Sequence, residues 1–376
     1  MRHLIVLDPG MDALVGHHLS ANVELARTAR ELGFTCTFAA GADVDSRYPD
    51  LLGWPVQAVF TNGPYRRIEN VAALDALLHQ QQEVVEQYWG LDIPDGACVL
   101  MHTPSPWHLQ ALADRLESAQ VRSAVCLMLP TSFWSTDSSV QCRLNDMATN
   151  ALRRLREGGG VSFAEVPGPF GDDAIFLPLS SGTLAKIDRW TATERMQSTA
   201  RPRFGYFGRP YGPKGFDVIV DALCGVTVNP DIQFFLPEGY VAVADELRER
   251  FPGVQASSVF RSNDRYFADM ASVDVVLCAY DPSAYACQMS GVVMEAALSG
   301  KATVATHGTA LARFVGTHAP DSYRLVDFSA SSIREAFADD DQAWRIRQRN
   351  AASHRESVRR LRTGAYFFSR AFGSSV

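Results

Sequence analysis

Residues 4–39, LIVLDPGMDALVGHHLSANVELARTARELGFTCTFA, decide the fold class of this chain. The short apolar run Leu4–Leu7 predicts a buried strand, and Phe34–Ala39 predicts a second one. Between them, apolar residues recur at spacings of three and four from Leu19 onward, which is the period of an amphipathic helix, and Gly33 ends that helix. Strand, loop, helix and strand in this order form a βαβ unit, from which parallel sheets are built.

The same alternation continues along the chain and restarts in its second half. Residues 178–202 lack periodicity, and we interpret them as the connection between two domains. We expect a first Rossmann-like domain over residues 1–185, a second over 200–355, and a C-terminal helix over 356–376 that crosses back to the first. The predicted fold class is α/β, with two doubly wound domains facing across a cleft. Ligands of such sheets bind at the carboxyl ends of the strands.

Composition narrows the class of protein. Of the 376 residues, 47% are hydrophobic and 20% charged, which excludes a disordered or collagen-like chain. The net charge of −7 and the short arginine clusters do not indicate a nucleic-acid binder. The seven cysteines form no C-x-x-C pair and predict free thiols in a reducing compartment. The N-terminal apolar run is too short for a signal peptide, and no apolar run of about 18 residues exists, so we expect a cytoplasmic protein.

Two cations lie in a glycine-rich loop in the second half. Residues 207–217, FGRPYGPKGFD, follow a predicted strand and precede a predicted helix. Arg209 can bind phosphate oxygens with its planar guanidinium, and Lys214 can place a point charge beside them. Gly208 allows the backbone to approach closely. The spacing alone fits a diphosphate-binding loop and a turn with two solvated cations equally well.

A lone acid lies in an apolar helix further along. Glu295 is the only acid in residues 290–300, SGVVMEAALSG. Burying a carboxylate alone is costly, so it needs partners, either ribose hydroxyls or a nearby arginine or amide. Gly291 lies near the expected start of the helix, where bare backbone can approach a phosphate.

Together these two motifs resemble glycosyltransferase family 4 of the GT-B superfamily. The resemblance is clear from Phe204 to Asp327 and weaker in the first half. It implies a GT-B fold, with the acceptor bound by the N-terminal domain and a nucleotide-sugar donor by the C-terminal one. It also implies a retaining hexosyltransferase that needs no metal, in which donor-phosphate oxygens help to deprotonate the acceptor hydroxyl.

The resemblance also implies roles for particular residues. Arg209 and Lys214 match its diphosphate-binding pair, and Glu295 matches the second acid of its Glu-x7-Glu motif, which holds the ribose. The first acid would fall at Cys287, so the sequence departs from the pattern there. The contacts to donor sugar or phosphate would then come from Cys287, Gln288, Ser290, Gly291 and Val292.

In the first half, the resemblance points to three further residues. Gly16 matches a glycine that lets backbone approach the donor phosphate, and His17 beside it would contact acceptor or phosphate. His102 ends a predicted strand, where many family members carry a histidine near the reacting sugar, and it is the candidate catalytic residue. The alternative is that His102 is a structural histidine that hydrogen-bonds to the backbone.

The sequence leaves several features open. The co-substrate would be a UDP-, GDP- or TDP-sugar, and no cofactor or metal is expected. The acceptor would be a glycan, a lipid-linked glycan or a small molecule. The alternative function is a weak or inactive GT-B protein that binds sugar nucleotides, which Cys287 favours. The C-terminal Tyr366-Phe367-Phe368, with Arg359, Arg360 and Arg362, either docks peripherally on the inner face of a membrane or packs within the protein.

Overall fold

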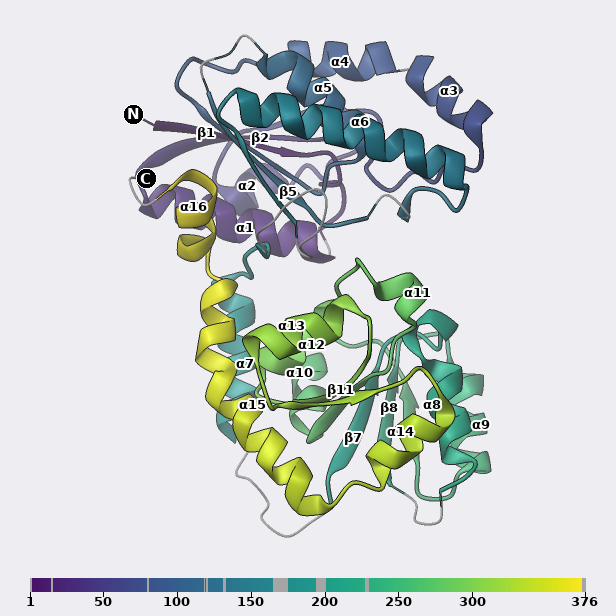
Figure 1. The fold of residues 1–376 in the computed structure, drawn as a ribbon. Helices are drawn as coiled ribbons and strands as arrows, with labels where there is room; N and C mark the ends of the chain where they lie inside the picture. The colour runs from purple at the N-terminus through teal and green to yellow at the C-terminus, as the bar shows by residue number, and fades with distance from the viewer. Residues whose placement is uncertain are drawn as a thin grey trace. The chain divides into compact units, whose positions relative to one another are not determined.

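The computed structural model describes residues 2–14, 16–79, 81–117, 119, 121–130, 133–164, 175–193, 201–226 and 230–373. The chain divides into two compact units, shown in Figure 1. Unit 1 comprises residues 1–180 and 361–376, and unit 2 comprises residues 181–360.

Unit 1 is built on a sheet of six parallel strands in the order β3-β2-β1-β4-β5-β6. The central strands are almost wholly buried, which is why their sequences are continuous apolar runs rather than alternating ones. The strands are β1 (Arg2–Asp8), β2 (Phe34–Gly41), β3 (Val56–Phe60), β4 (Cys98–His102), β5 (Arg122–Leu127) and β6 (Val161–Ala164).

Helices cover both faces of this sheet and form two apolar cores (Figure 1). One core packs α1, α2 and α16 against the sheet, and the other packs α4, α5 and α6. The helices of unit 1 are α1 (Gly16–Glu31), α2 (Tyr48–Leu52), α3 (Val71–His79), α4 (Gln81–Trp89), α5 (Pro106–Leu116), α6 (Ser138–Glu157) and α16 (Gly364–Phe372).

The C-terminal aromatic residues are part of the unit 1 core. Phe367 and Phe368 on α16 are each 1% exposed, and the Phe368 ring lies 6.0 Å from that of Phe34 on β2. Gly364 lies so close to Thr28 of α1 that a Cβ there would be 1.9 Å from the threonine hydroxyl. Of the two alternatives for this aromatic segment, the structure shows packing within the protein, because its two phenylalanines are buried inside unit 1.

Unit 2 repeats the same sheet topology. Its six parallel strands lie in the order β12-β11-β10-β7-β8-β9, which is the order of the first sheet with the strands counted from β7. The strands are β7 (Arg203–Phe207), β8 (Asp231–Leu236), β9 (Gln255–Ser258), β10 (Val275–Cys278), β11 (Ala302–Thr306) and β12 (Tyr323–Val326).

Helices flank the second sheet as well. A core of aromatic and aliphatic residues packs α8, α9, α14 and Trp344 of α15 against it. The helices are α7 (Ser181–Thr193), α8 (Phe216–Leu223), α9 (Val241–Arg250), α10 (Asn263–Ala271), α11 (Pro282–Tyr285), α12 (Gly291–Leu298), α13 (Ala310–His318), α14 (Ala330–Phe337) and α15 (Asp341–Leu361).

Part of the expected connection at residues 178–202 is helical. Helix α7 occupies Ser181–Thr193 and packs beside α10 in unit 2. Leu184 and Ile187 are buried three residues apart, a stripe too short to stand out among the Ser, Thr and Lys residues around it. No helix in the described ranges is long and apolar enough to cross a bilayer.

The two sheets confirm the expected pair of doubly wound α/β domains, and their strand order shows where the winding reverses. In each sheet the direction of winding reverses between the first and fourth strands. These are β1 and β4 in unit 1, and β7 and β10 in unit 2. The loops at the carboxyl ends of such a strand pair are where doubly wound sheets bind ligands.

The packing of α16 gives a stability prediction. Phe368→Ala removes a buried ring between Phe34 and Phe372, so we expect it to destabilise unit 1 by about 3–5 kcal/mol. Urea unfolding followed by circular dichroism measures this. The control is Ser369→Ala on the exposed side of the same helix, which should change stability by less than about 0.5 kcal/mol. Equal stability of the two variants would show that the packing of α16 does not stabilise unit 1.

Candidate functional site

The loop after β7 in unit 2 is held close to the end of β10. It contains a short 3-10 turn, Gly212–Lys214, and is followed by Gly215, whose φ is +72°. A Cβ at Gly215 would lie 1.8 Å from the carbonyl oxygen of Ala279, so only glycine fits this contact. The hydroxyl of Tyr206 donates to the Arg209 carbonyl at 2.5 Å and fixes the start of the loop.

The two loop cations and the helix acid are close enough to interact. Burial lowers the pKa of Lys214; the charge of Arg209 lowers it further, while Cys278 and Glu295 oppose the shift. The Lys214 ammonium lies 5.9 Å from the centre of the Tyr280 ring. Arg209 is exposed. The structure therefore brings together the residues predicted from the two separate motifs.

Glu295 is half-buried on α12 and has a protein partner. The Tyr266 hydroxyl of α10 donates to its Oε2 at 2.6 Å. A Cβ at Gly291 would lie 3.7 Å from its Oε1, so the carboxylate lies beside the bare backbone at the start of the helix. A carboxylate can accept several hydrogen bonds, which is the capacity that a pair of hydroxyl groups requires.

The residues from Cys287 to Val292, which lead into α12 and form its start, have mixed exposure. Cys287 is exposed, Gln288 and Val292 are half-buried, and Gly291 is exposed. Ser290 is 8% exposed, and its hydroxyl lies 3.3 Å from that of Tyr280. Cys287 thus lies where a side chain could meet a ligand, but its thiol cannot accept hydrogen bonds as a carboxylate does.

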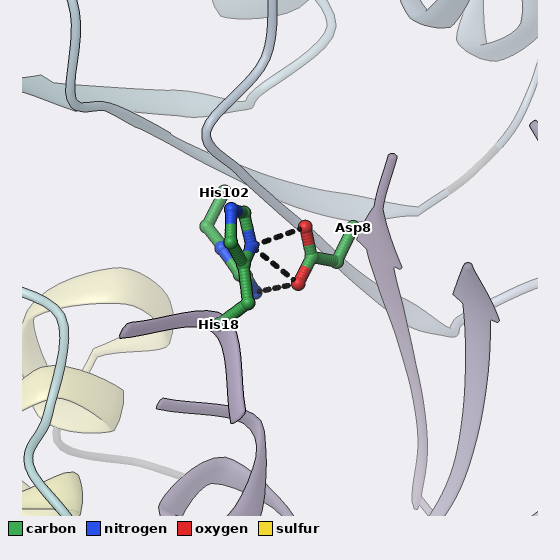
Figure 2. A group of neighbouring side chains, drawn as sticks. All are labelled: Asp8, His18 and His102. Carbon is green, nitrogen blue, oxygen red and sulfur yellow. Dashed lines mark hydrogen bonds and ion pairs between the residues drawn. The ribbon is translucent and has the colours of Figure 1, made fainter. Parts of the chain in front are cut away.

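A buried polar cluster lies at the switch point of unit 1. Asp8 ends β1, His102 ends β4, and His18 lies in the first turn of α1 (Figure 2). His18 Nδ1 lies 2.8 Å from Asp8 Oδ1, and His102 Nε2 lies 3.3 Å from Asp8 Oδ2. Asn22, one turn along α1 from His18, donates to Asp8 Oδ2 at 2.7 Å.

Burial and the contacts among these side chains set the protonation states of Asp8 and His102. Burial would raise the pKa of Asp8, but the charges of His102 and His18 and the hydrogen bonds from His18 and Asn22 hold it well below its usual value. Burial lowers the pKa of His102 to about 4, although Asp8 opposes this shift. At neutral pH the cluster therefore contains an ionised Asp8 and a neutral His102.

Among the residues that the structure describes, these three also form the group whose side chains could hold a metal ion. One nitrogen or oxygen atom from each of Asp8, His18 and His102 lies within 4.8 Å of the others. Hydrogen bonds among the same side chains already account for these atoms, because His102 Nε2 also lies 2.9 Å from Asn22 Oδ1.

The three residues predicted in unit 1, His102, Gly16 and His17, lie at the end of β4 and at the start of α1. His102 is fully buried, so it can act only through its neighbours in this conformation. Gly16 begins α1, whereas the side chain of His17 lies outside the described residues.

Sequence reasoning missed Asp8, and it considered His18 only beside His17, as a histidine near a helix start that could contact phosphate. Two signals were present: an acid directly at the end of the first strand, and a histidine and an asparagine four residues apart on one face of α1. Neither signal reveals that β4 brings His102 to the same place.

The architecture is that of the GT-B class, two Rossmann-like units with matching sheets. Among solved structures, the chain is similar to Anabaena Alr3699/HepE in complex with UDP, with 15% identity over 98% of each chain and a TM-score of 0.61. It is also similar to Acinetobacter baumannii MurG, with 14% identity over 95% of each chain and a TM-score of 0.56.

A third similar structure is the N-terminal domain of Candida albicans trehalose-6-phosphate phosphatase, with 12% identity over 100% of this chain and 97% of that one, and a TM-score of 0.63. No protein-family model matches the chain, and no curated protein sequence matches it. At these identities the similarity establishes the fold.

The close approach at Gly215 gives a prediction with an internal control. Gly215→Ala places a methyl group against the Ala279 carbonyl, so we expect it to destabilise unit 2 and displace the loop. Gly239 has a φ of +96°, and nothing lies within 4 Å of the position that a Cβ would take there, so Gly239→Ala should cost only about 1 kcal/mol of backbone strain. Urea unfolding of both variants measures the loss of stability that each substitution causes. A similar loss for both would mean that the approach to Ala279 imposes no constraint.

The buried histidines predict a pH dependence of stability. Burial lowers the pKa of His102 to about 4 and that of His108 to about 3, both from 6.5. The unfolded chain therefore binds more protons below pH 6.5, and stability falls as the pH drops from there toward 4. We expect a loss of about 1.4 kcal/mol per pH unit for each histidine, measured by urea unfolding.

The exposed His79 provides the control. His79→Gln should leave this slope unchanged. A flat stability profile between pH 7 and about pH 5 would contradict the burial of neutral histidines.

Proposed function

We propose that this protein is a glycosyltransferase that moves a sugar from a nucleotide-sugar donor to a hydroxyl acceptor. The observation that carries the proposal is the placement of Arg209 and Lys214 in the loop after β7 and of Glu295 on α12 after β10, the two strands that flank the switch point of unit 2. Two cations suit a diphosphate, and a nearby carboxylate suits the hydroxyls of a ribose. HepE, which has the same fold, has been crystallised with UDP and with UDP-glucose.

The diphosphate would bind to the loop after β7. Lys214 and Arg209 supply two positive charges, and Gly208 would let the backbone approach the phosphates, while Gly215 holds the loop against Ala279. When the bond between sugar and diphosphate breaks, negative charge develops on the leaving phosphate oxygens. Cations already in place stabilise that charge without reorganising, which lowers the barrier to transfer.

The ribose would bind to Glu295. Tyr266 donates one hydrogen bond to the carboxylate and restricts its orientation, and the ribose hydroxyls would donate to the same carboxylate. The donor sugar would then meet the segment that leads into α12 and the start of that helix, with contacts to Cys287, Gln288, Ser290, Gly291 and Val292. Cys287 stands where the resemblance places an acid, so donor sugars held through that acid would bind weakly.

The resemblance to family 4 adds finer features, which stay predictions. These are a UDP-, GDP- or TDP-sugar as donor, retention of the anomeric configuration without metal, and a cytoplasmic location. They also include the roles of residues 1–185 in acceptor binding and 200–355 in donor binding. In unit 1 the backbone at Gly16 would approach the donor phosphate, His17 would contact acceptor or phosphate, and His102 would lie beside the reacting sugar. The burial of His102 makes an indirect role more suitable.

A second function is a catalytically weak or inactive protein that binds sugar nucleotides. The observation that favours it is the exposed Cys287 in place of an acid. Binding of nucleotide sugars with no turnover of any of them would support this alternative.

Alanine variants of the two cations test the proposal. We expect Arg209→Ala and Lys214→Ala each to lower the release of UDP, GDP or TDP from its sugar by about 10²–10³-fold, because charge on the leaving group is no longer stabilised. Isothermal titration with UDP, GDP and TDP measures binding separately, and both variants should bind the active nucleotide more weakly.

Arg345→Ala, an exposed arginine on α15, is the matched control and should behave like the wild type. If none of the three nucleotides binds, or if both loop variants keep wild-type turnover, the donor assignment is wrong.

A further inference from the structure

A large cavity lies in unit 2 at the edge of the sheet where its strands begin. It has a volume of about 700 Å³, which is within the size range of sites for small organic molecules. It is surrounded by the starts of β7 and β8, the segment after α8, helix α14 and the start of α15. The loop with Arg209 and Lys214 follows the other end of β7, at the opposite edge of the sheet. The cavity is therefore separate from the candidate donor site.

The inner wall of the cavity is apolar and aromatic. Phe204 is 1% exposed, and its ring meets that of Phe337 edge to face, with 5.1 Å between their centres. Pro202, Val226 and Pro230 extend this apolar part of the lining. Such a wall favours a ligand with a ring-sized apolar group, because binding removes that group from water.

Asp231 is a carboxylate of the lining that forms no ion pair with any residue in the described ranges. It is the first residue of β8 and half-buried, and it lies opposite Arg203 on β7. Arg203 instead donates to Asp274 Oδ2, from its amide at 2.8 Å and from its Nε at 3.2 Å. Burial raises the pKa of Asp231; the charge of Arg203 opposes this shift, and that of Asp274 adds to it. A cation in the cavity would therefore stabilise the ionised form of Asp231.

The charged part of the lining is predominantly acidic. Its described acids are Asp231, Glu335, Asp339, Asp340 and Asp341, and its described cations are Arg201 and Arg334. Asp339 is neutralised by Arg324 and Arg347, which lie 3.4 and 3.0 Å from its Oδ2. Arg334 is held at the end of α8, where its Nε donates to the Ala222 carbonyl at 3.3 Å. The other acids form no ion pair with a described residue, so the cavity carries an excess of negative charge.

We propose that this cavity is a second ligand site, which binds an organic amine that carries a ring-sized apolar group. The protonated amine lies beside Asp231, and the apolar group lies against Phe204 and Phe337. The ammonium group donates charge-assisted hydrogen bonds to the carboxylate, which are stronger than bonds between neutral groups. The site does not depend on the proposed glycosyl transfer, so the amine binds whether or not a nucleotide does.

Phenethylamine is the probe for this site, and phenethyl alcohol and hydrocinnamate are its neutral and anionic counterparts. Isothermal titration of the intact protein measures the affinity for each. We expect the amine to bind about tenfold more tightly than either counterpart, because only its ammonium group donates a charge-assisted bond to Asp231. Equal or tighter binding of the alcohol or of hydrocinnamate would overturn the proposal. Failure of the amine to bind at about 10 mM would also overturn it.

Two conservative variants test the acids of the lining. Asp231→Asn keeps the shape of the side chain, and Glu335→Gln changes an exposed one, so both should fold. We expect Asp231→Asn to weaken phenethylamine binding by about tenfold and Glu335→Gln by about two- to threefold. Glu249→Gln, at an exposed acid on α9, is the matched control and should bind like the wild type. Wild-type affinity in both lining variants would contradict recognition of the amine by these acids.

Backbone amide NMR locates the bound amine. We expect shifts in residues 201–204, 225–226, 230–231 and 331–341, and none in the loop 208–215. Saturating UDP should change the affinity for phenethylamine by less than about twofold, since the two sites lie at opposite edges of the sheet. Displacement of the amine by UDP, or shifts confined to residues 208–215, would show that no separate site exists. If UDP does not bind while the cavity shifts persist, the donor assignment fails and the amine site stands.

Discussion

The buried carboxylate of Asp8 is the constraint around which unit 1 is organised. An ionised acid away from water is tolerated only if several donors surround it, since its desolvation cost is several kcal/mol. The donors come from three parts of the chain: the Gly10 amide after β1, His18 and Asn22 on α1, and His102 at the end of β4. The hydrogen bonds to this one carboxylate therefore connect the first strand, the first helix and the fourth strand.

Unit 2 uses the corresponding place in its sheet for the opposite charge. Lys214 and Arg209 follow β7, the first strand of that sheet, and Glu295 lies on α12 after β10, the fourth strand. The shared strand order puts both clusters at a winding reversal, where loops from neighbouring strands diverge and leave room for a ligand. One topology therefore places an ionised carboxylate at this point in one unit and two cations at the corresponding point in the other.

The sequence predicted the parallel sheets because their central strands are continuous apolar runs bounded by glycine and polar residues, as in Leu4–Leu7. The sequence did not predict helix α7, because its two buried positions, Leu184 and Ile187, are too few to display a helical period. It left open whether the aromatic tail faces a membrane or the protein, because apolar residues look alike in both settings. The burial of Phe368 against Phe34 depends on a strand more than three hundred residues away in the chain.

By itself, the sequence determined what depends on local order: the βαβ pattern, the glycine-rich loop with Arg209 and Lys214, and the lone Glu295 in an apolar helix. Only the tertiary structure decided which polar residues share one environment. His102 was visible as a histidine ending a strand, but its pairing with Asp8 and the contact of His18 with Tyr65 join residues 47 or more positions apart. Parallel strands connected by helices bring such distant residues to one edge of a sheet, and no local pattern records which of them will meet there.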